Sequence, residues 1–154
     1  MKPKPVSVKP LAARIEAAAW AALGLRISNI PLEPMFCLKF ARRVIETALG
    51  IADGGFYRLV TGVDANPSAA ELEELLRKQK PSWVVTNPLA GDLVFWHDLP
   101  KPWGHVGVLV TFKGALWVAQ NTTITNKGID YPGALRLILL FEMPVPTTFV
   151  RIAG

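Results

Sequence analysis

The sequence contains a single cysteine, Cys37, at a position that suits a nucleophile. Apolar residues recur at three- and four-residue steps after Pro34, which predicts a helix over residues 35–49 with Cys37 in its first turn. The first turn of a helix presents unpaired N–H groups and a partial positive charge, which favour the reactive thiolate. A lone cysteine is equally typical of a small buried core residue, so the position alone leaves both interpretations open.

Two histidines, His97 and His105, could supply the base that such a thiol needs. His105 begins an expected strand, and the glycines at positions 104 and 107 leave room for another group to approach its ring. His97 ends a different expected strand and is followed by Asp98, which is typical of a polar strand end. We therefore take His105 as the candidate base.

Four segments in chain order resemble the NlpC-type and CHAP cysteine peptidases, the papain-like bacterial wall hydrolases. They are residues 37–44 (CLKFARRV), 87–96 (NPLAGDLVFW), 104–110 (GHVGVLV) and 118–122 (VAQNT). Members of this superfamily carry a cysteine at a helix start, Gly-Asp and Gly-His each before an apolar strand, and a polar residue on the next strand. The resemblance covers residues 35–123, and the ordered set is more specific than any one of its motifs.

The resemblance implies a papain-like fold and amide hydrolysis. Cys37 would attack the carbonyl carbon, and His105 would take the thiol proton and return it to the leaving amine. Backbone N–H groups at the helix start would stabilise the oxyanion. Asn121 or Gln120 would orient His105, because this chain has neither a second histidine after His105 nor a glutamate at Ala119.

The turn of the expected hairpin decides between Asn121 and Gln120. Residues 106–111 and 115–119 flank Lys113-Gly114, which predicts two antiparallel strands. A two-residue turn would place His105 opposite Thr122 and diagonal to Gln120, whereas a three-residue turn would place it opposite Asn121. The resemblance to a Cys-His-Asn site favours Asn121, so we expect Asn121 to contact His105 and keep Gln120 as the alternative.

Three further sequence features bear on a site. Trp103, two residues before His105, is expected to line a substrate groove. Asp92 follows Gly91, and we interpret it as a turn-forming residue and not as a catalytic acid. One cysteine and two separated histidines give no recognised zinc spacing, so no metal or other cofactor is expected.

Composition limits the class of protein. The chain has 154 residues, of which 51% are hydrophobic and 19% charged, which excludes a disordered chain. A basic Pro/Lys tail over residues 1–10 would precede one catalytic domain over residues 11–154. The sequence has no apolar run of about 18 residues and no clear signal peptide, so no stable membrane insertion is expected. The charge of +5 suits anionic partners, but the basic residues are scattered, and no nucleic-acid surface is expected.

The periodicities predict an α+β fold with N-terminal helices packed on an antiparallel sheet. Helices are expected over residues 11–25, 35–49 and 68–80, the last with a Ser68–Glu71 capping box and a charged, solvated face. Strands are expected over residues 83–86, 93–96, 106–111, 115–119 and 135–141.

These observations predict a peptidoglycan hydrolase, either an endopeptidase or an amidase, whose partners are peptidoglycan or its muropeptides. A protein without a signal peptide would be cytoplasmic at synthesis and would reach the wall as a phage lysin or as an injected effector. Two alternatives remain: an isopeptidase or acyltransferase acting on a protein or lipid substrate, and a non-catalytic binding or assembly module of the same fold. The oligomeric state is not predicted.

Overall fold

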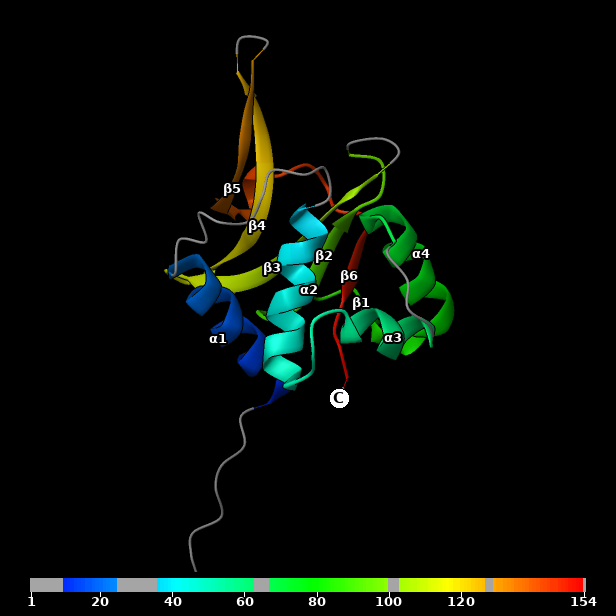
Figure 1. The fold of residues 1–154 in the computed structure, drawn as a ribbon. Coiled ribbons are helices and arrows are strands. Elements are labelled where there is room, and N and C mark those ends of the chain that lie inside the picture. Colours follow the sequence, from blue (N-terminus) through cyan, green and yellow to red (C-terminus); the bar gives the residue numbers. More distant parts are fainter. Residues whose placement is uncertain (1–9, 25–35, 63–66, 100–102, 127–128, 154) are drawn as a thin grey trace, which may run out of the picture.

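The computed structural model describes residues 10–24, 36–62, 67–99, 103–126 and 129–153. Its helices are α1 (Leu11–Gly24), α2 (Phe36–Leu49), α3 (Gly55–Thr61) and α4 (Ala69–Gln79), with 3-10 turns η1 (Pro81–Trp83) and η2 (Leu140–Glu142). Its strands are β1 (Val84–Val85), β2 (Leu93–Trp96), β3 (His105–Phe112), β4 (Ala115–Asn126), β5 (Ile129–Leu139) and β6 (Thr148–Val150) (Figure 1). Among these residues, no helix is both long enough and apolar enough to cross a membrane.

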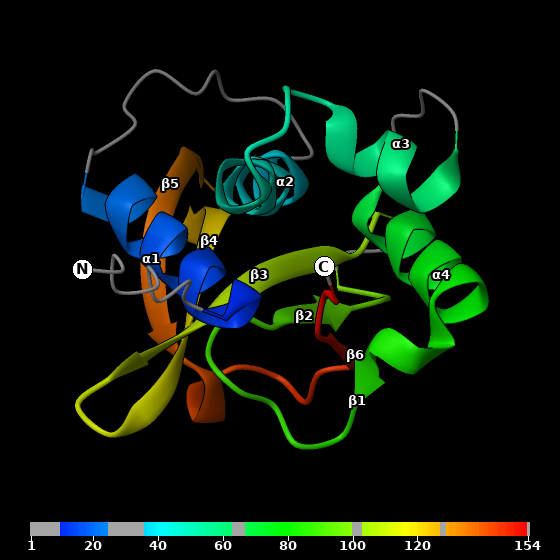
Figure 2. The same cartoon turned by 90° about the horizontal axis from the view of Figure 1, so that it is seen from below.

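Within this part of the chain, the strands form one antiparallel sheet in the order β1-β6-β2-β3-β4-β5. Helices α1 and α2 pack against β3 and β4, and α4 packs beside β2 (Figures 1 and 2). The predicted α+β class, with helices first and an antiparallel sheet second, is therefore confirmed. Strand β6 inserts between β1 and β2, next to the edge strand β1.

Two apolar clusters occupy the two faces of the sheet. The larger lies between the helices and the sheet and includes Ile45 of α2 with Val106 and Val108 of β3; we call this side the helix face. The smaller includes Trp96 and Leu109 on the opposite side, which we call the far face. Successive side chains of a strand point to opposite faces of the sheet. When one residue belongs to the cluster on one face, the side chains of the residues before and after it therefore point to the other face.

The hairpin between β3 and β4 has the two-residue turn that the sequence offered as one of two possibilities. Phe112 pairs with Ala115, and Lys113 and Gly114 have φ angles of 50° and 75°. Positive φ at both central positions matches the turn types whose twist suits adjacent antiparallel strands. Beyond this hairpin, β4 continues to Asn126 and pairs with β5, which together project from the body of the domain (Figure 1).

Most of the predicted elements are present. The helices expected over residues 11–25, 35–49 and 68–80 correspond to α1, α2 and α4, and the capping box of Ser68 and Glu71 is formed. The prediction that the charges of α4 form a solvated face is wrong at Glu73, which is 0% exposed and accepts a hydrogen bond from Thr148 Oγ1 at 2.7 Å. Helix α3 and strand β6 were not predicted. Residues 1–9 of the expected tail lie outside the described residues.

Asp92 is a structural residue, as its place in the Gly91-Asp92 turn predicted. Its Oδ2 accepts from the Leu89 backbone N–H at 2.8 Å, and both carboxylate oxygens bind the guanidinium of Arg151 at 2.8 and 2.9 Å. Gly91 has a φ of 95°, and a Cβ at this position would lie 2.2 Å from the carbonyl oxygen of Ala12. Gly91 therefore packs the start of β2 against α1, and Asp92 joins it to Arg151, which follows β6.

Candidate active site

Cys37 lies in the first turn of α2 and is partly buried against the cluster on the helix face. Burial raises the pKa of its thiol above the ordinary value of 9.0, against the opposite effect of the backbone N–H groups of Val106, Leu38 and Cys37 itself. The expectation that the helix start would leave the thiol with a low pKa is therefore wrong for this arrangement. Desolvation outweighs the N–H groups because the sulfur has little contact with water.

The thiol lies where the ladder between β3 and β4 ends. Paired residues run from Phe112↔Ala115 to Val108↔Ala119 and no further. The backbone groups of Leu109 bind Gly91 and Asp92 on the β2 side, and successive residues of a strand direct these groups to opposite sides. The N–H of Val106 therefore points toward β4, beyond the end of the paired residues, and this N–H acts to lower the pKa of the Cys37 thiol.

His105 projects from the far face of the same strand. It pairs with Trp96 across the β2–β3 ladder, and the two rings lie 5.5 Å apart between centroids. Trp96 belongs to the far-face cluster, whereas Val106, the next residue of β3, belongs to the helix-face cluster. Cys37 and His105 are both described, and no hydrogen bond joins them. The structure thus places the predicted nucleophile and base on opposite sides of β3.

The residue that contacts His105 is Gln120. The Nε2–H of His105 donates to Gln120 Oε1, and the amide nitrogen of Gln120 contacts the sulfur of Met143 at 3.7 Å, which fixes the orientation of the amide. This donation leaves Nδ1 as the unprotonated nitrogen of the neutral ring. Burial lowers the pKa of His105, against the opposite effect of the Gln120 bond, so the neutral ring is favoured.

The expectation that Asn121 would contact His105 is wrong in this structure. The two-residue turn places Gln120 and not Asn121 on the far face, as the register argument required for that turn. Asn121 lies on the helix face, two residues beyond Ala119 of the larger cluster. It is 5% exposed, and its Oδ1 is buried without a hydrogen-bond partner. A buried unpaired carbonyl oxygen is costly, so it marks a position where a donor would be stabilised.

Trp103 lies at the surface just before the candidate base. Its side chain is 51% exposed, and its backbone oxygen accepts from the N–H of Ala70 at the start of α4 at 2.9 Å. Gly104 has a φ of 71°, and a Cβ there would lie 2.9 Å from the Ala70 nitrogen. The side chain of Trp103, which was expected to line a groove, is therefore exposed. The backbone of Trp103 and Gly104, just before His105, packs against the start of α4.

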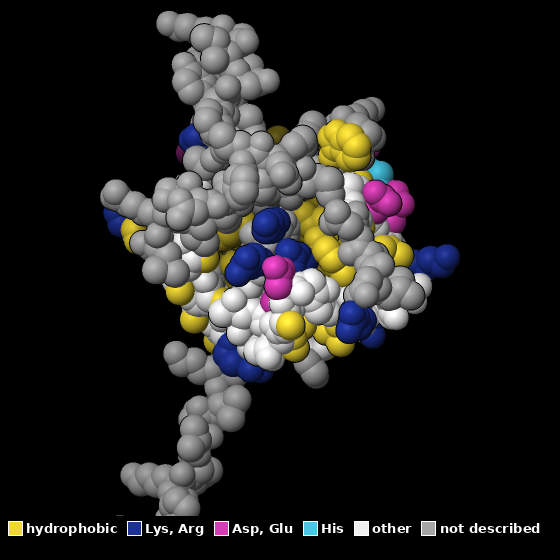
Figure 3. Space-filling model, viewed as in Figure 1, with side chains coloured by type: hydrophobic (Ala, Val, Ile, Leu, Met, Phe, Trp, Pro, Cys, Tyr) yellow, Lys and Arg dark blue, Asp and Glu magenta, His cyan; other side chains and the backbone are white. Residues whose placement is uncertain are grey.

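A buried ion pair between Arg42 and Glu46 lies on α2. Arg42 binds Glu46 at 2.7 Å and also binds Asp53, and Glu46 accepts from the backbone N–H of Phe56 at 3.1 Å. Arg42, Arg43 and Lys39 all lower the pKa of Asp53. Figure 3 shows a group of basic side chains around an acidic one on this face of the molecule. These contacts join α2, which carries Cys37, to the loop at Asp53 and to the start of α3.

In the described ranges, no group of three or more His, Cys, Asp or Glu side chains is arranged to hold a metal ion. Comparisons of the chain with protein-family models, with curated proteins and with solved structures found no match.

Two buried contacts of this domain were not predicted from the sequence. Met143 contacts Gln120 from 23 positions away, and no local pattern connects the two. The burial of Glu73 could have been predicted from the sequence. Residue 73 follows Leu72 and lies three positions before Leu76, so it falls on the buried side of a helix whose buried face is wide.

Proposed function

We propose that this protein is a cysteine hydrolase of amide bonds, with a papain-like NlpC/CHAP fold and peptidoglycan as its substrate. One observation carries the proposal. The chain's single cysteine lies in the first turn of α2, where the backbone N–H groups of Cys37 and Leu38 act to lower the pKa of its thiol against the effect of burial. N–H groups at a helix start favour the thiolate, which is the form of cysteine that attacks a carbonyl carbon.

The active form requires His105 to reach the helix face. Residues 105–107 have ladder partners in β2 alone, since the β3–β4 ladder ends at Val108. A rotation of this short segment, which lies between Gly104 and Val108 and includes Gly107, would exchange the partner of His105. Nε2–H would then donate to Asn121 Oδ1 instead of Gln120, and Nδ1 would face Cys37. The buried unpaired Oδ1 of Asn121 supports this arrangement.

The reaction then follows from these groups. Nδ1 of His105 takes the thiol proton, and the sulfur attacks the amide carbon to give a tetrahedral oxyanion. The imidazolium returns the proton to the leaving nitrogen, the C–N bond breaks, and a thioester remains on Cys37. Water, deprotonated by His105, attacks the thioester and releases the carboxylic acid and the thiol. No other reactant is needed.

Peptidoglycan as substrate rests on the resemblance, and the net charge of +5 suits the anionic wall. Action on the wall as a phage lysin or an injected effector belongs to the same proposal. The test is zymography of the purified protein on bacterial walls, with mass spectrometry of the fragments to identify the bond. New amine and carboxyl ends in the peptide stems are expected from the wild type and not from Cys37→Ala. Hydrolysis of a protein or lipid amide instead would favour the isopeptidase or acyltransferase alternative.

One observation favours a second candidate, a non-catalytic wall-binding or assembly module. In the described arrangement, the base lies across the strand from the thiol, and burial raises the thiol pKa. Wall binding without any new fragment ends, at every pH tested between 5 and 9, would decide for this module and against the hydrolase.

A further inference from the structure

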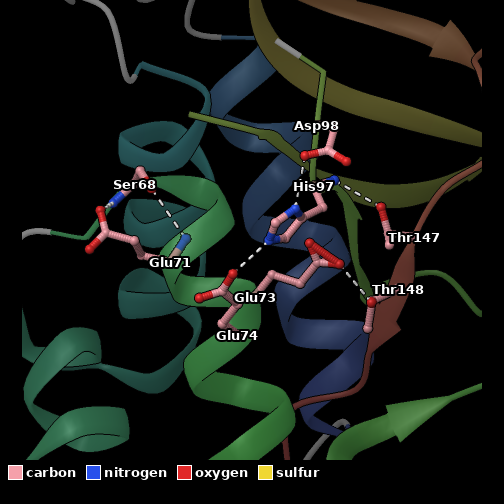
Figure 4. A network of polar contacts seen from close by, with 8 residues as sticks. All are labelled: Ser68, Glu71, Glu73, Glu74, His97, Asp98, Thr147 and Thr148. Carbon is pink, nitrogen blue, oxygen red and sulfur yellow. Dashed lines mark hydrogen bonds and ion pairs between the residues drawn. The ribbon is translucent and has the colours of Figure 1, made fainter. Parts of the chain in front are cut away.

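His97 is held between carboxylates at the end of β2 (Figure 4). Its Nε2 lies 2.8 Å from Glu74 Oε1 of α4, and its Nδ1 lies 3.1 Å from Asp98 Oδ1. The His97 backbone N–H donates to Thr147 Oγ1 at 2.8 Å, just before β6. One residue therefore connects α4, the end of β2 and the approach to β6.

Both ring nitrogens of His97 face carboxylate oxygens, which accept hydrogen bonds and do not donate them when ionised. A neutral imidazole has one N–H and could satisfy only one of the two carboxylates. The other nitrogen would then present a lone pair to a negative oxygen. The observed arrangement is therefore that of the imidazolium, which donates from both nitrogens.

We propose that His97 is a proton-dependent tie that fastens the end of β2 to α4 and restrains the start of β3, where His105 lies. The regulatory half of this inference rests on the proposed function, because it concerns the rotation of His105 toward Cys37. When His97 loses its proton, one of its two carboxylate contacts is lost and the end of β2 is held less firmly.

The path from the tie to the candidate base is short. Trp96 precedes His97 in the chain, pairs with His105 in the β2–β3 ladder and contacts its ring. The same helix that carries Glu74 also binds the backbone of Trp103 through Ala70. Both ends of the connection between β2 and β3 are thus attached to α4, and the tie at His97 is the one that can titrate.

The charged surroundings of His97 support this behaviour. Glu74 first and Asp98 second raise the pKa of His97 above 6.5, and Glu73 adds to the effect. Glu73 is itself buried, with Oε1 bound to Thr148 and Oε2 unpaired, and burial raises its pKa against the effects of Thr148, His97 and Arg77. His97 therefore faces three acidic groups, two from α4 and one from its own turn, and Arg77 is the basic group that acts on Glu73.

The first experiment follows the ring protons of His97 by NMR during a pH titration of the intact protein. The wild type should titrate above 6.5, and Glu74→Gln and Asp98→Asn should each lower the midpoint toward 6.5. Glu142→Gln removes one charge from the exposed η2 turn and serves as the matched control, with no change expected. An unchanged His97 midpoint in both Glu74→Gln and Asp98→Asn would overturn the tie.

The second experiment measures wall hydrolysis against pH in the same proteins. Activity should rise with pH through the His97 midpoint, and Glu74→Gln should shift this rise to lower pH. At pH values below the wild-type midpoint, Glu74→Gln should be several-fold more active than the wild type. A shifted NMR midpoint with an unshifted activity profile would overturn the restraint on His105. A shifted midpoint with no hydrolysis at any pH would contradict the proposed function and leave the tie in place.

Discussion

Cys37 packs against one face of strand β3 and His105 projects from the other, although the backbone N–H of Val106, the residue after His105, acts on the pKa of the Cys37 thiol. Both residues lie at β3, but the backbone of this strand separates their side chains. A hydrolase built on this pair must therefore have a resting form and an active form, and variants of the two residues should have different effects on activity and on stability.

Cys37→Ala should abolish wall hydrolysis while the protein stays folded. Loss of a nucleophile costs many orders of magnitude in rate, whereas loss of one partly buried sulfur costs on the order of 1–2 kcal/mol of stability. Zymography gives the rate, and circular dichroism during thermal unfolding gives the stability. Hydrolysis within tenfold of the wild type would exclude Cys37 as the nucleophile.

His105→Ala should be nearly as damaging as Cys37→Ala, and His97→Ala should be mild. Residues that act as one unit show non-additive losses, so the Cys37→Ala/His105→Ala double variant should be no worse than either single variant. The comparison uses rates on the same wall preparation. If His97→Ala abolished hydrolysis and His105→Ala did not, the assignment of the base would be wrong.

Helices α1, α2 and α4, the hairpin and the α+β class followed from local patterns, because caps, turn residues and apolar periodicity act over a few positions. Ser68 with Glu71 defined the start of α4, and Lys113-Gly114 defined the β3–β4 turn. The hairpin also contained the information that Gln120 shares the face of His105. The resemblance outweighed that register argument and led to the wrong preference for Asn121.

Long-range placement could not be predicted in the same way. Strand β6 has three residues, Thr148–Val150, and its place between β1 and β2 depends on pairing with segments more than fifty residues away. Helix α3 has seven residues and follows an N-cap, Gly54, with no side-chain cap, so its local signal is weak. The burial of Glu73 depends on Thr148 in that same unpredicted strand.

Asn121→Ala and Gln120→Ala should separate the resting form from the active form. If His105 binds Asn121 during catalysis, Asn121→Ala should lower the rate on the order of 10²-fold or more, because the base is no longer oriented. Gln120→Ala removes only the resting partner and should leave the rate within a few-fold of the wild type. Rate loss in Gln120→Ala alone would show instead that Gln120 orients His105 in the active form.

Asp92→Ala should destabilise the protein without acting on the chemistry. Asp92 is fully buried, and its removal leaves the Leu89 N–H and the Arg151 guanidinium without their acceptor. The Arg151 side chain is 35% exposed and also donates to the Asn87 carbonyl oxygen at 3.0 Å, so the cost is that of the lost buried hydrogen bonds, about 1–3 kcal/mol. Chemical denaturation measures this loss, with Glu142→Ala as an exposed acidic control. A loss below about 1 kcal/mol would show that the pair is not a structural contact in solution.

The reactivity of Cys37 tests whether the divided site is the form present in solution. Burial raises the thiol pKa above its ordinary value, so only a small fraction of the molecules carries the thiolate at pH 7. Alkylation by iodoacetamide, followed by mass spectrometry, should therefore be slow at pH 7 and should accelerate about tenfold per pH unit up to at least pH 9. His105→Ala should leave this profile unchanged, because His105 does not contact the thiol in this form. A rate that is already at its plateau near pH 7, and that falls in His105→Ala, would mean that the thiolate and imidazolium are paired in the free protein and that His105 already occupies the helix face.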